Sequence, residues 1–166
     1  MAILASVISL NSYAAEGNLA AGTVGLNVST QLPFTALATN ATNPFFEITG
    51  KMVTQGNLML LAGAGLANNS PSGGSSYTDF ALTLGARKYF TNGDFAPFFG
   101  GHFQRVLAGA GGQRVGMTII AFDAGAEYFL NKHFSFEGGV GFGFGTSAGT
   151  DYLGTANYGL SANFYF

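Results

Sequence analysis

Eight segments of this chain alternate apolar residues with small or polar ones at a period of two, the pattern of β-strands that bury one face. In the first segment Val24, Leu26 and Val28 stand on one face, and Gly25 and Ser29 stand on the other. The segments cover residues 23–29, 46–52, 58–66, 79–87, 99–104, 122–128, 134–144 and 157–166. The pattern predicts an all-β chain of eight amphipathic strands.

The connections between these segments alternate in length. The short ones are rich in Asn, Gly and Asp, as tight hairpin turns require, and cover residues 55–57, 91–94 and 131–133. The longer ones are polar or glycine-rich and cover residues 30–43, 68–76, 105–116 and 146–151. Long and short connections in alternation predict an antiparallel up-and-down meander with both termini at the short-turn end.

Charged residues are scarce along the whole chain. They make up 8% of the 166 residues, against about 25% in an average soluble domain. Mean hydropathy is +0.30, yet no uninterrupted apolar run reaches the roughly 18 residues of a membrane-spanning helix. The composition disfavours disorder, a coiled coil and a helical membrane protein. A net charge of -2 with dispersed basic residues also argues against nucleic acid as a partner.

The charges within the strands share one face with the glycines, and this bears on which face is buried. An eight-stranded meander could be a soluble barrel with its large apolar face inside, as in lipocalins. Small residues turned inward would instead leave room for a few polar side chains in a narrow lumen, with the apolar face toward lipid. We therefore predict an eight-stranded antiparallel up-and-down transmembrane β-barrel. Its inward charges would be Glu47, Lys51, Asp79, Arg87, Asp123, Glu127 and Glu137.

Four of the inward charges lie at one level of the predicted lumen. Lys51, Arg87, Glu127 and Glu137 are each three or four residues from the nearest turn, and strands rise about 3.3 Å per residue. A hairpin centred on Lys132 would place Glu127 opposite Glu137, an unfavourable arrangement of like charges. A guanidinium bridges two carboxylates better than an ammonium does. We therefore expect Arg87 between or beside them, with Lys51 reaching from across the barrel.

The rest of the predicted network lies higher in the lumen. His102 and Asp123 fall at nearly equal depth on neighbouring strands and form a candidate pair. Glu47 and Asp79 complete the set. The network has two interpretations: an ion-pair plug that satisfies charges in a filled lumen, or a gate whose rearrangement opens a narrow water path.

Three features resemble a known family. Residues 95–101 (Phe-Ala-Pro-Phe-Phe-Gly-Gly) open a strand directly after a turn, and the chain ends on Phe166. Together with the meander, they resemble the small eight-stranded outer-membrane β-barrels of Gram-negative bacteria, of the OmpA or opacity type, over about residues 17–166. The resemblance is specific for the architecture and weak for activity.

The resemblance implies a location and partners. Proteins of this family lie in the bacterial outer membrane with periplasmic termini, among outer-membrane lipids and lipopolysaccharide, and we expect a monomer. The barrel-assembly machinery reads their last strand through alternating hydrophobic residues that end in an aromatic. Ser161 stands where the common pattern has Gly. The residues that fit this assembly signal are Tyr158, Leu160, Phe164 and Phe166.

The first 14 residues differ from the rest. An apolar stretch over residues 2–10 precedes Ser12 and Ala14, small residues at the two positions that a signal peptidase reads. A positively charged start is missing. We interpret residues 1–14 as a signal-peptide remnant, with a buried first segment as the alternative, and expect residues 15–166 to form a single barrel domain.

The sequence predicts no catalytic residue, cofactor or metal site. Cysteine is absent, and no His and carboxylate spacing indicates a metal. His133, Ser135 and Glu137 echo the His-x-Ser phrase of outer-membrane lipid A deacylases, but His133 falls in a turn away from the outer leaflet. We predict a structural, envelope-integrity or surface-interaction role. A narrow passive pore for small solutes or ions is the alternative, and a lipid A-modifying enzyme is a remote one.

Overall fold

A computed structural model describes residues 18–31, 35–36, 45–69, 77–110, 113–157 and 160–166. Nearly all of this part of the chain is strand, and none of its helices is long and apolar enough to cross a membrane. The elements are β1 (Val24–Gln31), β2 (Thr35–Ala36), β3 (Phe45–Val53), the 3-10 helix η1 (Gln55–Asn57), β4 (Leu58–Asn69), β5 (Tyr77–Tyr89), β6 (Phe95–Ala110), β7 (Gln113–Asn131), β8 (Phe134–Ser147), β9 (Thr150–Asn157) and β10 (Ser161–Tyr165). The predicted segment of residues 1–14 lies outside the described residues.

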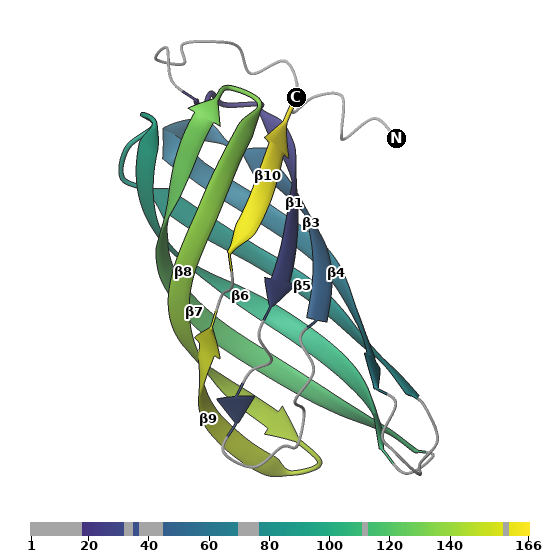
Figure 1. Cartoon of the computed structure of the whole chain (residues 1–166). Coiled ribbons are helices and arrows are strands. Elements are labelled where there is room, and N and C mark those ends of the chain that lie inside the picture. Colours follow the sequence, from purple (N-terminus) through teal and green to yellow (C-terminus); the bar gives the residue numbers. More distant parts are fainter. Residues whose placement is uncertain (1–17, 32–34, 37–44, 70–76, 111–112, 158–159) are drawn as a thin grey trace, which may run out of the picture.

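The strands close into one barrel (Figure 1). From β3 to β9 each strand pairs antiparallel with the next along the chain, and β3 also pairs with β1. β9 and β10 both pair with β8, at different heights, while β10 pairs with β1 and β9 pairs with β2. Taking β1 with β2, and β9 with β10, as one strand position each gives eight positions. The predicted eight-stranded antiparallel up-and-down barrel is confirmed.

The barrel has two distinct ends. The β7–β8 hairpin and the C-terminus lie at the top of Figure 1, at what we call the turn end, and the β8–β9 turn lies at the opposite, loop end. Tight turns join β3 to β4, β5 to β6 and β7 to β8 where the sequence predicts them. The expected long connections over residues 30–43 and 68–76 fall mostly outside the described residues.

The other two expected long connections are wrong. β6 continues to Ala110 and β7 begins at Gln113, so most of residues 105–116 is strand. The backbone ladder between these strands continues through Gly and Ala up to the pair of Ala110 with Gln113.

The expected loop over residues 146–151 is a tight turn. β8 ends at Ser147 and β9 begins at Thr150. Ala148 and Gly149 between them have positive φ angles of 49° and 81°, as the favoured two-residue hairpin turns require. The long and short alternation therefore fails at both the β6–β7 and the β8–β9 connections.

Large apolar side chains cover the outward face. Leu84 is 62% exposed and Val140 is 68% exposed, although both lie within long strands. The seven strand charges of the other face are all buried, as are Asn27 and Asn163. The predicted orientation, with glycines and charges inside and the apolar face outside, is confirmed.

Apolar side chains fill the lumen at two heights, and most of the buried polar ones lie between. Ala81, Val106, Ile119 and Ala121 form a small cluster toward the loop end. Leu19, from the segment before β1, joins the larger cluster and is 2% exposed. This larger cluster, at the turn end, consists of Leu19, Val53, Met59, Leu61, Tyr89, Ala96, Phe98, Phe129 and Tyr165.

Candidate functional site

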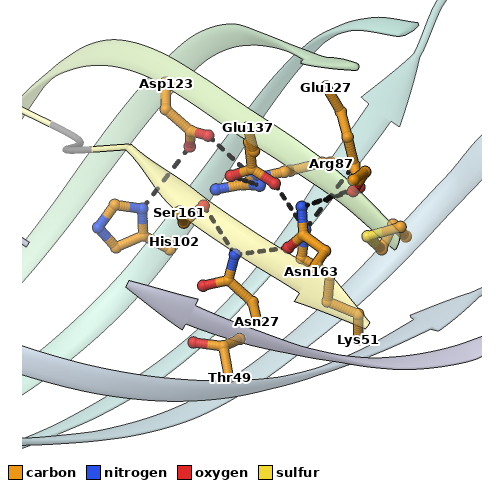
Figure 2. Close-up of polar contacts among 12 residues, drawn as sticks. Asn27, Thr49, Lys51, Arg87, His102, Asp123, Glu127, Glu137, Ser161 and Asn163 are labelled. Atoms are coloured by element: carbon orange, nitrogen blue, oxygen red, sulfur yellow. Dashed lines mark hydrogen bonds and ion pairs between the residues drawn. The ribbon is translucent and has the colours of Figure 1, made fainter. Parts of the chain in front are cut away.

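The lumen holds every residue of the predicted network. All are buried, and with His102 counted as neutral the two cations and five carboxylates give a formal net charge of -3. Within the described part of the chain, no buried side-chain nitrogen or oxygen lacks a hydrogen-bond partner. Figure 2 shows most of these side chains converging from different strands. The network consists of Glu47, Lys51, Asp79, Arg87, His102, Asp123, Glu127 and Glu137.

Glu137 forms ion pairs with both Lys51 and Arg87. Its Oε2 accepts from Lys51 Nζ at 2.5 Å, and its Oε1 accepts from Arg87 Nη1 at 2.5 Å. Arg87 Nε donates to Asp123 Oδ2 at 3.1 Å. The Arg87 guanidinium carbon also lies 4.4 Å from the centre of the Phe98 ring. Arg87 therefore links two carboxylates and packs on an aromatic face.

Of the two predicted positions for Arg87, the structure has it beside Glu137, and Lys51 reaches the paired glutamates from another strand, as expected. Glu127 and Glu137 do pair across β7 and β8. Lys51 lies between them, with its Nζ 2.5 Å from Glu137 and 3.7 Å from Glu127. Arg87 instead extends to Asp123, because Arg87, Gly100 and Asp123 form one row across β5, β6 and β7. Gly100 leaves this row open for the guanidinium.

Glu127 accepts four hydrogen bonds from side chains of the described residues. Its Oε1 accepts from the Tyr165 hydroxyl at 2.7 Å, from Asn163 Nδ2 at 2.9 Å and from the Ser135 hydroxyl. Its Oε2 accepts from the Tyr89 hydroxyl at 2.7 Å. These donors come from β5, β8 and β10. Glu127 therefore ties strands from both sides of the barrel to one buried charge.

Asparagines extend this network to the first strand. Asn27 Nδ2 donates to Asn163 Oδ1 at 2.6 Å and to the Ser161 hydroxyl at 2.8 Å. Asn163 Nδ2 in turn donates to the Ser135 hydroxyl at 3.0 Å. The β1–β10 closure is therefore joined through side chains as well as through its backbone ladder.

Glu47 is held by hydroxyl groups. Thr49 donates to its Oε1 at 2.8 Å and Thr83 donates to its Oε2 at 3.2 Å, while Gln104 Nε2 donates to Thr83 at 3.1 Å. Next to this group lies a cavity of about 30 Å³ that Glu47, Lys51, Arg87, His102 and Glu137 help to line. A water molecule needs about 10–15 Å³ of space for its centre, so this cavity of about 30 Å³ has room for about two water molecules.

The remaining predicted residues lie nearer the loop end of the barrel than Lys51 and Glu127 do. His102 Nδ1 is 3.6 Å from Asp123 Oδ1, an ion pair when the imidazole is protonated. Asp79 is buried on β5 opposite Ala67 of β4. The structure therefore connects His102, Asp123 and Arg87 to Glu137, and Lys51 connects Glu137 to Glu127. Asp79 lies nearer the loop end.

Bulky lumen side chains lie over glycines of the neighbouring strand. A Cβ placed on Gly100 would lie 2.5 Å from Arg87 Cγ, and one placed on Gly63 would lie 2.5 Å from Glu47 Oε1. A Cβ on Gly25, Gly85 or Gly125 would likewise clash with Tyr165, His102 or Phe98, respectively. The high glycine content therefore gives room to the large inward side chains.

Gly100→Ala should displace Arg87 and destabilise the barrel by about 1–3 kcal/mol, the usual cost of overpacking. Gly50→Ala is the matched control, because a Cβ on Gly50 would lie 3.6 Å from the Ala62 carbonyl oxygen, an ordinary van der Waals contact. Urea unfolding of both variants in micelles measures the difference. Equal unfolding free energies would contradict the role of Gly100.

Several lumen residues are missing from the prediction although the same periodicity could have placed them. Arg87 is inward, so Tyr89 must be inward too, and Asn163 implies Tyr165 in the same way. The predicted network contains only ionisable side chains, whereas hydroxyl and amide groups donate many of its hydrogen bonds. The residues missed in this way are Asn27, Thr49, Thr83, Tyr89, Gln104, Ser135, Ser161, Asn163 and Tyr165.

Residues of the predicted assembly signal face outward where they are described. Leu160, Phe164 and Phe166 are exposed, whereas Tyr158 lies outside the described residues. Ser161 points into the lumen and is buried. The role of this pattern in assembly stays a prediction.

The His-x-Ser phrase does not form a nucleophile and base pair. His133 Nδ1 donates to the Tyr165 carbonyl at 3.0 Å, while the Ser135 hydroxyl donates to Glu127 in the lumen. A general base must lie within hydrogen-bond reach of the proton that it takes. His133 and Ser135 therefore serve different parts of the turn end.

Comparison with solved structures shows the same fold. The N-terminal β-barrel domain of Pseudomonas aeruginosa OprF matches with a TM-score of 0.62 at 14% identity, over 88% of this chain and 98% of that chain. Neisserial surface protein A matches with a TM-score of 0.60 at 11% identity, over 87% and 95%. Ail, the attachment invasion locus protein of Yersinia pestis, matches with a TM-score of 0.50 at 11% identity, over 88% and 99%.

These structures are small eight-stranded outer-membrane barrels, so the resemblance in architecture is confirmed. No protein-family profile matches the chain, and no curated protein sequence matches it. At identities of 11–14% the likeness concerns the fold alone.

Proposed function

We propose, from a fold shared with small eight-stranded outer-membrane barrels, that this chain is an integral outer-membrane protein that supports the envelope or presents a surface for interaction. The turn end and both termini would face the periplasm, and the loop end the exterior. Outer-membrane lipids and lipopolysaccharide would surround a monomeric barrel. The barrel-assembly machinery would read its last strand.

The observation that carries this proposal is the apolar outward belt. Exposed large apolar side chains occur on almost every strand, and closure leaves no free sheet edge between β3 and β8. In water such a surface would far exceed the patches of a few hundred Å² found on soluble monomers. In lipid it is the surface that a barrel needs.

Leu84→Arg is expected to destabilise the barrel in lipid vesicles by about 2–4 kcal/mol, the cost of an arginine on the lipid face near the bilayer midplane. Leu84 is fully outward on β5, well inside the strand. Unfolding can be followed by the change in gel mobility that heating causes in a refolded barrel. Circular dichroism of the same samples would report their strand content.

Leu130→Arg is the matched control for this experiment. Leu130 is 56% exposed but lies next to the β7–β8 turn, where the expected cost is only about 0–1 kcal/mol. Equal costs at the two positions would contradict a lipid belt. A sample whose mobility does not change on heating, with little strand signal, would contradict the barrel itself.

For the lumen we propose a plug built from paired charges. Glu137, Glu127 and Asp123 each contact a cation or several hydrogen-bond donors, and aromatic side chains pack at the turn end. Buried charges need such pairing, since an isolated one is very costly. The plug supports a structural role over a conduit.

A narrow pore is the second candidate, and the cavity beside Glu47 favours it. This cavity joins two carboxylates to Lys51 and Arg87 inside a lumen whose formal net charge is -3. If rearranged ion pairs extended this cavity along the barrel, the resulting water path would favour cations. A substitution that removes Lys51 or Arg87 should then increase the conductance of the barrel.

A further inference from the structure

Arg105 is a cation on the outward face of the barrel. It follows the outward Phe103 by two residues on β6, and it pairs with Leu82 of β5 and Thr118 of β7. Phe103 and Leu82 are 45% and 50% exposed, so apolar side chains surround the base of Arg105. The sequence predicted a loop here, whereas the strand sets this guanidinium against the outer wall.

Two residues of β7 fix the position of the guanidinium. Arg105 Nη1 donates to the Thr118 hydroxyl at 2.5 Å. A Cβ built on Gly116 would lie 2.9 Å from Arg105 Cζ, so the side chain occupies the space that Gly116 leaves open. Gly116 pairs with Leu107, which lies further toward the loop end than Arg105. The guanidinium therefore points toward the loop end.

Lys88 is a second outward cation, and it points the other way. Its Nζ donates to the Gly56 carbonyl in η1, at the turn end. Lys88 pairs with Phe99 and Leu82 pairs with Arg105, so six residues of strand separate the two rows. This is roughly 15 Å of height at a tilt of about 40°. With both side chains directed away from the middle, the charges bracket an apolar belt on the order of 25 Å tall.

Arg105 has unused capacity for a ligand at this edge. A guanidinium carries five N–H donors, and among the described residues the hydrogen bond to Thr118 uses one of them. No carboxylate of the described residues forms an ion pair with Arg105. Lipid phosphate is the anion present at the edge of a membrane belt, and guanidinium groups bind phosphate with paired hydrogen bonds.

We propose that Arg105, whose guanidinium is held by Thr118 and lies in the space that Gly116 leaves, forms a binding site for the phosphate headgroup of an outer-leaflet lipid. The site rests on the proposed outer-membrane function, which places the loop end in the outer leaflet. Arg105 supplies charge and donors, Thr118 orients the guanidinium, and Gly116 keeps it against the wall. The headgroup lies beside the barrel, outside the lumen.

The test measures lipid-dependent stability of the refolded protein in phosphatidylcholine vesicles that contain increasing fractions of bisphosphorylated lipid A. We expect lipid A to raise the temperature at which the gel mobility changes. Arg105→Gln should need about tenfold to hundredfold more lipid A for the same rise, since hydrogen bonds to charged groups contribute about that factor. Gly116→Ala should also weaken the effect, although it retains the charge.

Lys88→Gln is the matched control and should respond to lipid A as the wild-type protein does. A wild-type response in Arg105→Gln would overturn the site, as would equal stabilisation of wild type by inorganic phosphate in pure phosphatidylcholine. Stabilisation by phosphatidylglycerol as strong as that by lipid A would support the site with a glycerophospholipid as its ligand. A protein with no folded band in pure phosphatidylcholine would contradict the proposed function instead.

Discussion

Glu127→Ala is expected to lower the free energy of unfolding by about 3–5 kcal/mol, the range for breaking a buried charge network. The substitution removes the acceptor of the Tyr89, Tyr165 and Asn163 donors and one carboxylate beside Lys51. Each buried donor left without a partner adds a desolvation cost. Urea unfolding in micelles, followed by circular dichroism, measures the loss.

Two further variants interpret this result. Asp151→Ala removes an exposed carboxylate of β9 and should change stability by less than about 0.5 kcal/mol. Glu127→Gln retains the shape of the side chain, but its amide N–H groups would face the Tyr89, Tyr165 and Asn163 donors, so this variant should remain clearly destabilised. A Glu127→Ala protein as stable as Asp151→Ala would show that Glu127 does not organise the lumen.

Arg87→Ala is the second substitution with a large expected effect, again about 3–5 kcal/mol. Glu137 would retain Lys51, while Asp123 would face only a histidine among its contacts described above. The formal net charge of the lumen would become about -4, and the packing of the guanidinium on Phe98 would be lost. Unfolding in phosphatidylcholine vesicles measures the stability.

Planar bilayers separate plug from pore in the same variant. If the lumen is plugged, the wild-type protein should show no conductance. If it is a pore, the wild-type protein should conduct, and Arg87→Ala should raise the current and its preference for cations. Arg105→Ala is the matched control, because it removes the same side chain from the outer wall. Unchanged stability of Arg87→Ala relative to Arg105→Ala would contradict the proposed network.

The sequence predicted the barrel because one physical constraint acts on every strand. A strand with lipid on one side and a crowded lumen on the other must alternate, so periodicity alone places Leu84 outside and Arg87 inside. The pairing of Glu127 with Glu137 followed from counting across one hairpin. Both results depend on local geometry.

The partners of each charge required information that counting does not contain. Lys51 reaches Glu137 across 86 residues of sequence, through the interior of the closed barrel. Whether Lys51 or Arg87 lies between two glutamates depends on side-chain direction and on where a glycine leaves space. The ends of β6 and β7 were missed for a different reason, because the sequence over residues 105–116 lacks the regular apolar alternation that marks the other strands.

The closure between β1 and β10 makes the end of the chain the last requirement for folding. Five residue pairs join these strands, and Asn27 donates to Ser161 across 134 residues of sequence. Such distant contacts form slowly and only after the whole length is present. A chain in which β10 has not yet paired therefore has an open edge at β1, and its Glu127 lacks the Asn163 and Tyr165 donors. Pairing of β10 with β1 therefore closes the barrel and completes the hydrogen bonds of Glu127 in the same step.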